Sequence, residues 1–114
     1  MELVEKTISI NRLKEMSSKM FGGLVKAVVD VEKNLLVVDS ELHSDEEAFL
    51  LKEGSEKENL WGVNIYPNFE KEKMIEFDSM INLRPSFGNN SRGVESKKTQ
   101  KMILKFLSSK ITND

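Results

Sequence analysis

The stretch LVKAVVDVEKNLLVVDSEL, residues 24–42, decides the fold, because it contains two valine-rich runs joined by a short polar turn. β-Branched residues favour strands. Lys33 and Asn34 separate the two runs, and asparagine tolerates the positive φ that a tight hairpin turn requires. The stretch therefore predicts a β-hairpin, and the rest of the chain must supply the elements that cover it.

An amphipathic helix is expected before the hairpin. Three apolar residues recur there at helical spacing, namely Leu13, Met16 and Met20. Ser9 or Asn11 can cap the first turn, because a short side-chain oxygen accepts a hydrogen bond from a free amide of that turn. Gly22-Gly23 would end this helix, and a short strand is expected before it, within residues 3–8.

A second, short helix is expected after the hairpin, over about residues 45–53. Ser44 and Glu47 have the S-x-x-E spacing of a capping box, in which each side chain satisfies a free amide at the helix start. Asp45 and Glu46 suit the positive end of the helix dipole. Gly54 would end this helix.

The C-terminal half predicts two more strands and a last helix. LWGVNIYP (60–67) and MIEFDSMINLRP (74–85) both end in proline and read as an antiparallel pair, and SKKTQKMILKFLSSKI (96–111) reads as an amphipathic helix. The sequence thus predicts one α+β domain over residues 1–114, in the order β-α-β-β-α-β-β-α. We expect a mainly antiparallel sheet of four to five strands with two or three helices, the first and last of them on one face.

The composition excludes several classes of protein. The 114 residues include no cysteine, which rules out disulfides, a thiolate nucleophile and a sulfur-ligated zinc site. The N-terminal stretch lacks an export signal and no run is long enough to span a bilayer, so a cytoplasmic location and no membrane contact are expected. No G-x-S-x-G elbow or Walker pattern is present, and no cofactor is predicted.

Charge is unevenly distributed along the chain, although the net charge is only −2. Residues 39–58 are rich in Asp and Glu, whereas residues 92–110 are rich in Lys and Arg. A domain without a net positive charge is a poor nucleic-acid binder, so nucleic acid is not the expected partner. We expect the two segments to attract one another, within one chain or across a homodimer.

A polar sheet face is predicted from the alternation in the last two strands. If residues 74–85 form one strand, Ile75, Phe77, Ile81 and Leu83 lie on its core face. The opposite face then carries six polar side chains: Asn64, Tyr66, Glu76, Asp78, Asn82 and Arg84. The simplest explanation is that an antiparallel sheet exposes one face to water. Asn and Asp are poor strand formers, however, and a ligand or a hydrogen-bonded network would explain them.

The loop RPSFGNNSRGVES, residues 84–96, suggests an anion site. Its glycines and asparagines allow unusual backbone angles, and it leads into the start of the last helix, where free amides attract anions. We expect Arg84 and Arg92, with the backbone around Asn89, Asn90 and Ser91, to bind a phosphate or carboxylate. The alternative is an ordered loop whose arginines pair with internal carboxylates.

His43 is the only histidine and lies among acids in ELHSDEE. It could serve as a general base, as could Glu76 or Asp78, and these three are the candidate catalytic residues. A metal site with Glu41 and Asp45 is disfavoured, because the expected helix breaks their alignment and better explains the acids. No metal is predicted.

Three phrases resemble a family of small uncharacterised prokaryotic proteins, a domain of unknown function. They are FGGLVKAVVDVEKN, ELHSDEEAFLLKEGSEKENLWGVNIYP and IEFDSMINLRPSFGNNSRGVES, which together span most of the chain. The resemblance implies a single-domain bacterial or archaeal protein and carries no activity with it.

Two functions are compatible with these residues. One is binding of an anionic small molecule on the polar face and loop, with or without catalysis. The other is a non-enzymatic protein interaction module or homodimer, which would use the polar face and the basic last helix. The sequence does not distinguish an enzyme from a binding protein.

Overall fold

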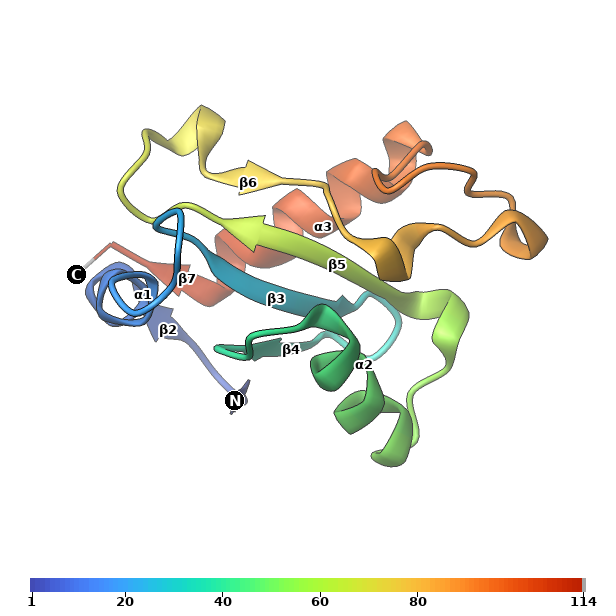
Figure 1. Ribbon diagram of the computed structural model, residues 1–114, viewed down its shortest axis with the longest axis horizontal. Helices are drawn as coiled ribbons and strands as arrows, with labels where there is room; N and C mark the ends of the chain where they lie inside the picture. Colours follow the sequence, from blue (N-terminus) through green and yellow to red (C-terminus); the bar gives the residue numbers. More distant parts are fainter. Residues whose placement is uncertain (114) are drawn as a thin grey trace.

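The core of the protein is a five-stranded antiparallel sheet, shown in Figure 1. The computed structural model describes residues 1–113. The strand order is β1–β4–β3–β5–β6, with the bounds Glu2–Val4, Leu35–Val38, Val25–Asp30, Leu60–Ile65 and Ile75–Glu76. The α+β class and the mainly antiparallel sheet are as predicted. The observed order adds two short strands to the predicted one, β2 (Ile8–Ser9) and β7 (Ile111–Thr112), which pair in parallel.

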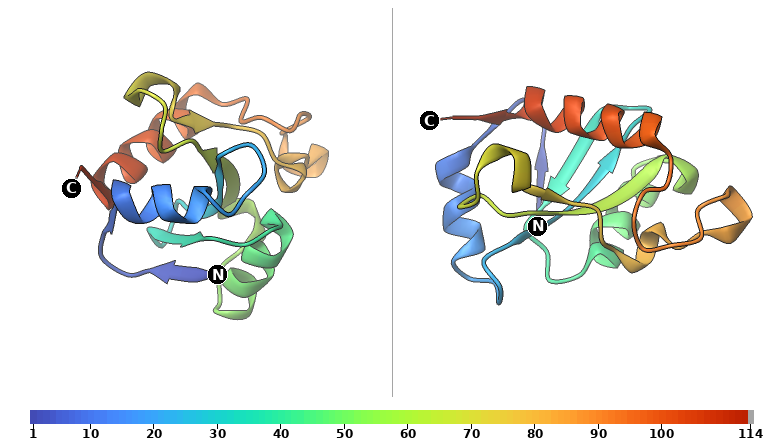
Figure 2. Two further views of the ribbon diagram at one scale, coloured as in Figure 1. Left: turned by 60° about the vertical axis from the view of Figure 1, so that its left-hand side comes forward. Right: turned by 90° about the horizontal axis from the view of Figure 1, so that it is seen from above.

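Helices cover both faces of this sheet, as Figure 2 shows. Helices α1 (Ile10–Ser17) and α3 (Lys97–Lys110) pack on one face, where Leu13, Met16, Ile103 and Leu107 join the larger hydrophobic core. Helix α2 (His43–Lys52) lies on the other face, where Leu50 joins the smaller core. The first and last helices therefore share a face, as expected from the sequence.

The β3–β4 hairpin forms at the predicted position. Asn34 takes a positive φ of 56° in the turn. The buried Asp30 carboxylate orders the same turn, since its Oδ1 accepts hydrogen bonds from the amides of Glu32 and Lys33, both at 2.9 Å. Its Oδ2 accepts from the Ser55 hydroxyl at 2.6 Å. One carboxylate thus joins the hairpin to the segment that follows α2.

The two predicted helix caps have different outcomes. Ser9 caps α1, its hydroxyl accepting from the amide of Arg12 at 3.0 Å, which confirms the prediction. The capping box of Ser44 and Glu47 is wrong: α2 begins at His43, and its N-cap, Leu42, makes no side-chain cap bond. Tertiary contacts set this start instead, because the His43 ring bonds to the Val63 carbonyl. Gly54, at φ 102°, follows the end of α2 as expected.

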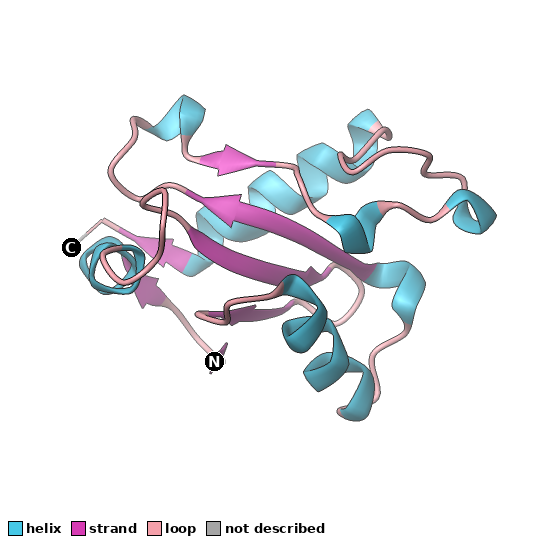
Figure 3. Ribbon diagram, viewed as in Figure 1, coloured by secondary structure: helices cyan, strands magenta, loops and turns pink. Residues whose placement is uncertain are grey.

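The strand predicted over residues 74–85 is mostly wrong. Strand β6 has only two residues. Figure 3 shows loop and single helical turns after it, η3 (Met80–Asn82) and η4 (Pro85–Phe87). The Asn82 side chain replaces a strand neighbour: its Oδ1 accepts from the Gly62 amide at 2.8 Å, and its Nδ2 donates to the Gly62 carbonyl at 2.9 Å. A Cβ on Gly62 would lie 2.7 Å from Ser79, so only glycine allows this close approach.

The alternation built on that strand fails for the same reason. Asn82 and Arg84, expected on an open polar face, are buried, whereas Leu83, expected in the core, is exposed. The six polar residues therefore do not form one continuous surface.

The acidic and basic segments also do not pair within the chain. Three ion pairs occur among residues 1–113, Glu2–Arg12, Glu70–Lys73 and Asp78–Arg92, and none joins α2 to α3. The two helices lie on opposite faces of the sheet, which keeps their charges apart (Figure 2). No helix within residues 1–113 has the length and apolar character needed to cross a membrane.

Candidate functional site

The Gly/Asn/Arg loop is held closed by its own hydrogen bonds. Arg84 and Asn89 pair as an isolated β-bridge. The buried Asn89 side chain donates to the carbonyls of Asn82, Ser91 and Gly93, and its Oδ1 accepts from the amide of Glu95 at 3.0 Å. These bonds occupy the polar atoms of the Asn89 amide, so this side chain orders the loop.

Two further loop residues predicted to bind ligand also make internal bonds. The Asn90 amide donates to Glu95 Oε1 at 3.2 Å, and the Ser91 hydroxyl accepts from the amide of Gly93 at 3.2 Å. The Asn82 side chain likewise makes hydrogen bonds to the backbone of Gly62 and to the carbonyl of Arg92. The polar groups of this loop therefore bind to one another and are not left open for a ligand.

Arg84 is buried at the start of β5, with 5% of its surface exposed. Its guanidinium carbon lies 4.2 Å from the centroid of the Trp61 ring, a cation–π contact, and its Nη1 donates to the Lys57 carbonyl. Its Nε and Nη2 have no hydrogen-bond partner among residues 1–113. Burial lowers the pKa of Arg84, and the carboxylates of Glu47 and Glu58 oppose that shift. Arg84 therefore lies among acids and apart from Arg92.

Three of the predicted residues form a hydrogen-bonded group across β5 and β6. Glu76 Oε1 accepts from the Asn64 side chain at 2.9 Å and from the Tyr66 hydroxyl at 3.0 Å. Burial, followed by this bond to Glu76, raises the pKa of Tyr66. Asn64 also donates to the carbonyl of Asp78 at 3.2 Å. The group fixes the start of the segment that carries Asp78.

Asp78 and Arg92 form the best-defined ion pair of this region. Arg92 Nε donates to Asp78 Oδ1 at 2.6 Å, and roughly half of each side chain is exposed, 53% for Arg92 and 44% for Asp78. The two terminal nitrogens of Arg92 have no hydrogen-bond partner within residues 1–113. The carboxylate therefore orients the guanidinium while leaving its outer donors available.

His43 lies in the first turn of α2, and the charges of both members of this ion pair act on it. Its Nε2 lies 2.8 Å from the Val63 carbonyl, and a carbonyl only accepts, so Nε2 carries the proton and Nδ1 carries the lone pair of the neutral ring. Burial lowers the pKa of His43, and the charges of Lys26 and Arg92 lower it further, against Asp78 and the Val63 bond. His43 is therefore neutral at pH 7.

The structure adds two residues that the sequence did not identify, Lys26 and Glu46. Lys26 pairs with Asn64 across β3 and β5 and acts electrostatically on both His43 and Glu46. Glu46 is fully buried, and burial raises its pKa to about 9, so it is uncharged at pH 7 and does not neutralise Lys26. The sequence did contain a sign of Lys26, since a lysine within a valine run must lie on the sheet face opposite Val25 and Ala27.

We name the group formed by these residues the α2-end site. Its members are Lys26, His43, Asn64, Glu76, Asp78 and Arg92. Chemically it offers hydrogen-bond donors from Lys26 and Arg92, an imidazole lone pair, and a helix start that no side chain caps. Within the described part of the chain, no group of three His, Cys, Asp or Glu side chains is arranged to hold a metal ion.

Comparison with protein families identifies a family that covers nearly the whole chain. The model of a family described as a protein of unknown function, DUF5674, matches residues 2–110. Neither the curated proteins nor the solved structures contain a significant match. The comparisons thus assign the chain to a family and assign no chemistry to the α2-end site.

Proposed function

This chain belongs to the DUF5674 family, which supplies no activity, and we propose from the geometry of the α2-end site that the protein binds a small anion. The observation that carries this proposal is the state of Arg92: Asp78 holds its Nε at 2.6 Å, and its terminal nitrogens have no hydrogen-bond partner within residues 1–113. Its charge also acts on the neutral His43. A guanidinium oriented in this way donates two parallel hydrogen bonds to a carboxylate or phosphate.

Two neighbouring features support an anion over a cation. Besides burial, the charges of Lys26 and Arg92 both lower the pKa of His43, whereas Asp78 is the one carboxylate that raises it, so two cations and one anion act on the ring. The uncapped N-terminus of the ten-residue helix α2 adds its dipole at the same place. The lone pair on His43 Nδ1 would accept a hydrogen bond from the hydroxyl of a singly protonated phosphate.

The charge of the site limits the ligand. Lys26 and Arg92 contribute two positive charges, Glu76 and Asp78 contribute two negative charges, and His43 and Glu46 are neutral at pH 7. Binding would therefore depend on directed hydrogen bonds more than on net charge. A ligand with one carboxylate or one phosphate fits this arrangement better than a polyanion.

The test is a thermal melt of the native protein with increasing inorganic phosphate and acetate. A ligand that binds only the folded state raises the midpoint, by about 2.7 kcal/mol of stability at a hundred times its Kd. Arg92→Gln should abolish this rise. Arg12→Gln is the matched control, because Arg12 forms a similar exposed ion pair with Glu2 at 2.7 Å, and it should keep the rise. An equal rise in both variants would refute the proposal.

A protein interaction module is the second candidate, favoured by exposed apolar side chains near the loop. Met80, Leu83 and Phe87 are 61%, 42% and 53% exposed, on the segment between β6 and α3, part of which (orange) projects from one end of the molecule in Figure 1. Apolar residues grouped on a projecting segment are typical of contact surfaces. Light scattering would detect self-association through this surface, and Phe87→Ser should lower it; a native monomer at high concentration would count against a homodimer.

A further inference from the structure

A pocket on the α3 face of the sheet has the features of a second binding site. Helix α2, which carries His43 of the α2-end site, lies on the opposite face. It lies between α3 and the β3–β4 turn and has a volume of about 470 Å³. That volume falls within the range of about 300–1,000 Å³ that is usual for small-molecule sites. The lining residues are Val31, Asn34, Met102, Lys105, Phe106, Ser109 and Lys110.

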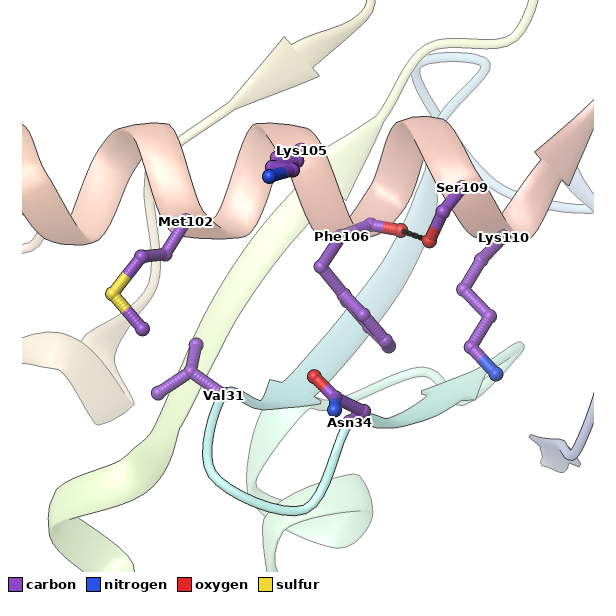
Figure 4. A pocket seen from close by; sticks show the side chains of 7 residues that line it. All are labelled: Val31, Asn34, Met102, Lys105, Phe106, Ser109 and Lys110. Atoms are coloured by element: carbon purple, nitrogen blue, oxygen red, sulfur yellow. Dashed lines mark hydrogen bonds between the residues drawn. The ribbon is translucent and has the colours of Figure 1, made fainter.

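The wall of this pocket is mostly apolar. Figure 4 shows Met102 and Phe106 extending from α3 toward Val31 and Asn34 on the turn. Met102 is 43% exposed, although α3 has polar residues at most of its other outward positions, and Phe106 and Val31 are half-buried at the edge of the larger core. An apolar body of a ligand would cover these three side chains and remove them from water.

The rim of the pocket is positively charged. Helix α3 contains five lysines and no Asp or Glu, and no lysine of α3 forms an ion pair within residues 1–113. Lys105 has no hydrogen-bond partner there. Lys110 lies 5.6 Å from the centre of the Phe106 ring and donates to the carbonyl of Glu5 at 3.3 Å. No lining residue is acidic, so nothing in the pocket offsets the two ammonium groups.

We propose that this pocket binds an amphipathic anion, a small molecule with an aliphatic or aromatic body and one carboxylate or sulfonate. The body would lie against Met102, Phe106 and Val31, and the acid group would meet Lys105 and Lys110 at the rim. An ion without an apolar part, such as phosphate, gains nothing from the apolar wall. This pocket is independent of the α2-end site, which lies at the N-terminus of α2.

The test is a fluorescence titration with 1-anilinonaphthalene-8-sulfonate, an aromatic sulfonate that becomes fluorescent in apolar surroundings. We expect one probe molecule per chain, displaced by octanoate and not by inorganic phosphate. Lys105→Gln should weaken binding by about two- to five-fold, the range expected for the loss of one exposed ion pair. Ser109→Trp, which places a bulky ring in the pocket, should abolish binding.

Lys98→Gln is the matched control, since Lys98 is an exposed lysine at the start of α3 that does not line the pocket. It should bind the probe like the native protein. Circular dichroism melts of all variants distinguish a lost site from a lost fold. Equal affinity in native protein, Lys105→Gln and Ser109→Trp would overturn the proposal, and so would displacement of the probe by phosphate.

Discussion

Glu46 makes the stability of this protein depend on pH in a direction opposite to that of most carboxylates. Its side chain is fully buried between α2 and the segment after β4, where Oε2 accepts a hydrogen bond from the amide of Ser40 at 3.1 Å. In the described part of the chain, Oε1 has no hydrogen-bond partner. Burial, and to a smaller extent Asp39, raise its pKa to about 9, while the Ser40 amide, the N-terminal amine and Lys26 oppose the shift. The folded protein therefore keeps a proton that the unfolded chain releases.

The size of this effect follows from proton linkage. Below pH 4.5 the carboxyl is protonated in both the folded and the unfolded state, so its ionisation does not lower the free energy of unfolding. Between pH 4.5 and about 9 only the folded state holds the proton, so each pH unit lowers the free energy of unfolding by about 1.4 kcal/mol. At pH 7 the loss is about 3 kcal/mol. Glu46→Gln has no proton to take up and keeps an oxygen for Ser40, so we expect it to restore about that amount.

Urea denaturation followed by Trp61 fluorescence at several pH values between 5 and 8.5 measures the difference. The gain in the free energy of unfolding from Glu46→Gln should be small at pH 5 and grow with pH. The contributions of other titrating groups, such as His43, cancel in this difference because both proteins contain them. Glu15→Gln, at an exposed position of α1, is the control and should show no such trend. A gain that is constant with pH, or a loss at pH 8.5, would refute a protonated Glu46.

Three further substitutions test the contacts around β5. Gly62→Ala should destabilise the fold by about 1–3 kcal/mol in urea melts, because its Cβ would lie 2.7 Å from Ser79. Asn82→Ala should cost about 3 kcal/mol, since it leaves both backbone groups of Gly62 without their side-chain partner; a loss under 1 kcal/mol would contradict this. Arg84→Met keeps an unbranched stem on Trp61 and removes two unpaired donors, so stability should change by less than about 1 kcal/mol. A larger loss would mean that the guanidinium is satisfied in solution.

The sequence predicted those elements whose signals are local. The β3–β4 hairpin follows from two valine runs and an asparagine with positive φ, and the Ser9 cap follows from one side chain and one amide. Helix α3 follows from a long amphipathic pattern. In each case the residues that decide the structure are neighbours in the chain, and no contact from elsewhere competes with them.

The missed features depend on contacts between distant residues. Asn82 bonds to Gly62, 20 positions earlier, and this pairing ends the strand that alternation alone would continue to Pro85. His43 bonds to Val63, also 20 positions away, and α2 begins at His43 without the predicted capping box. Polar residues in a strand-like pattern can form an exposed sheet face, or they can be buried and bond to backbone groups in place of a neighbouring strand. Their spacing in the sequence is the same in both cases.

The same ambiguity divides the predicted site. Arginine, asparagine and aspartate were expected to share one surface, yet Asn82 and Asn89 use their amides to shape the loop, and Arg84 stacks on Trp61 near acids. Arg92 differs because its partner, Asp78, occupies only its Nε. An arginine that is held at one nitrogen and exposed at the others is already oriented for a ligand, so little side-chain entropy remains to be lost on binding. Arg92 is thus the residue on which the proposed binding of an anion depends.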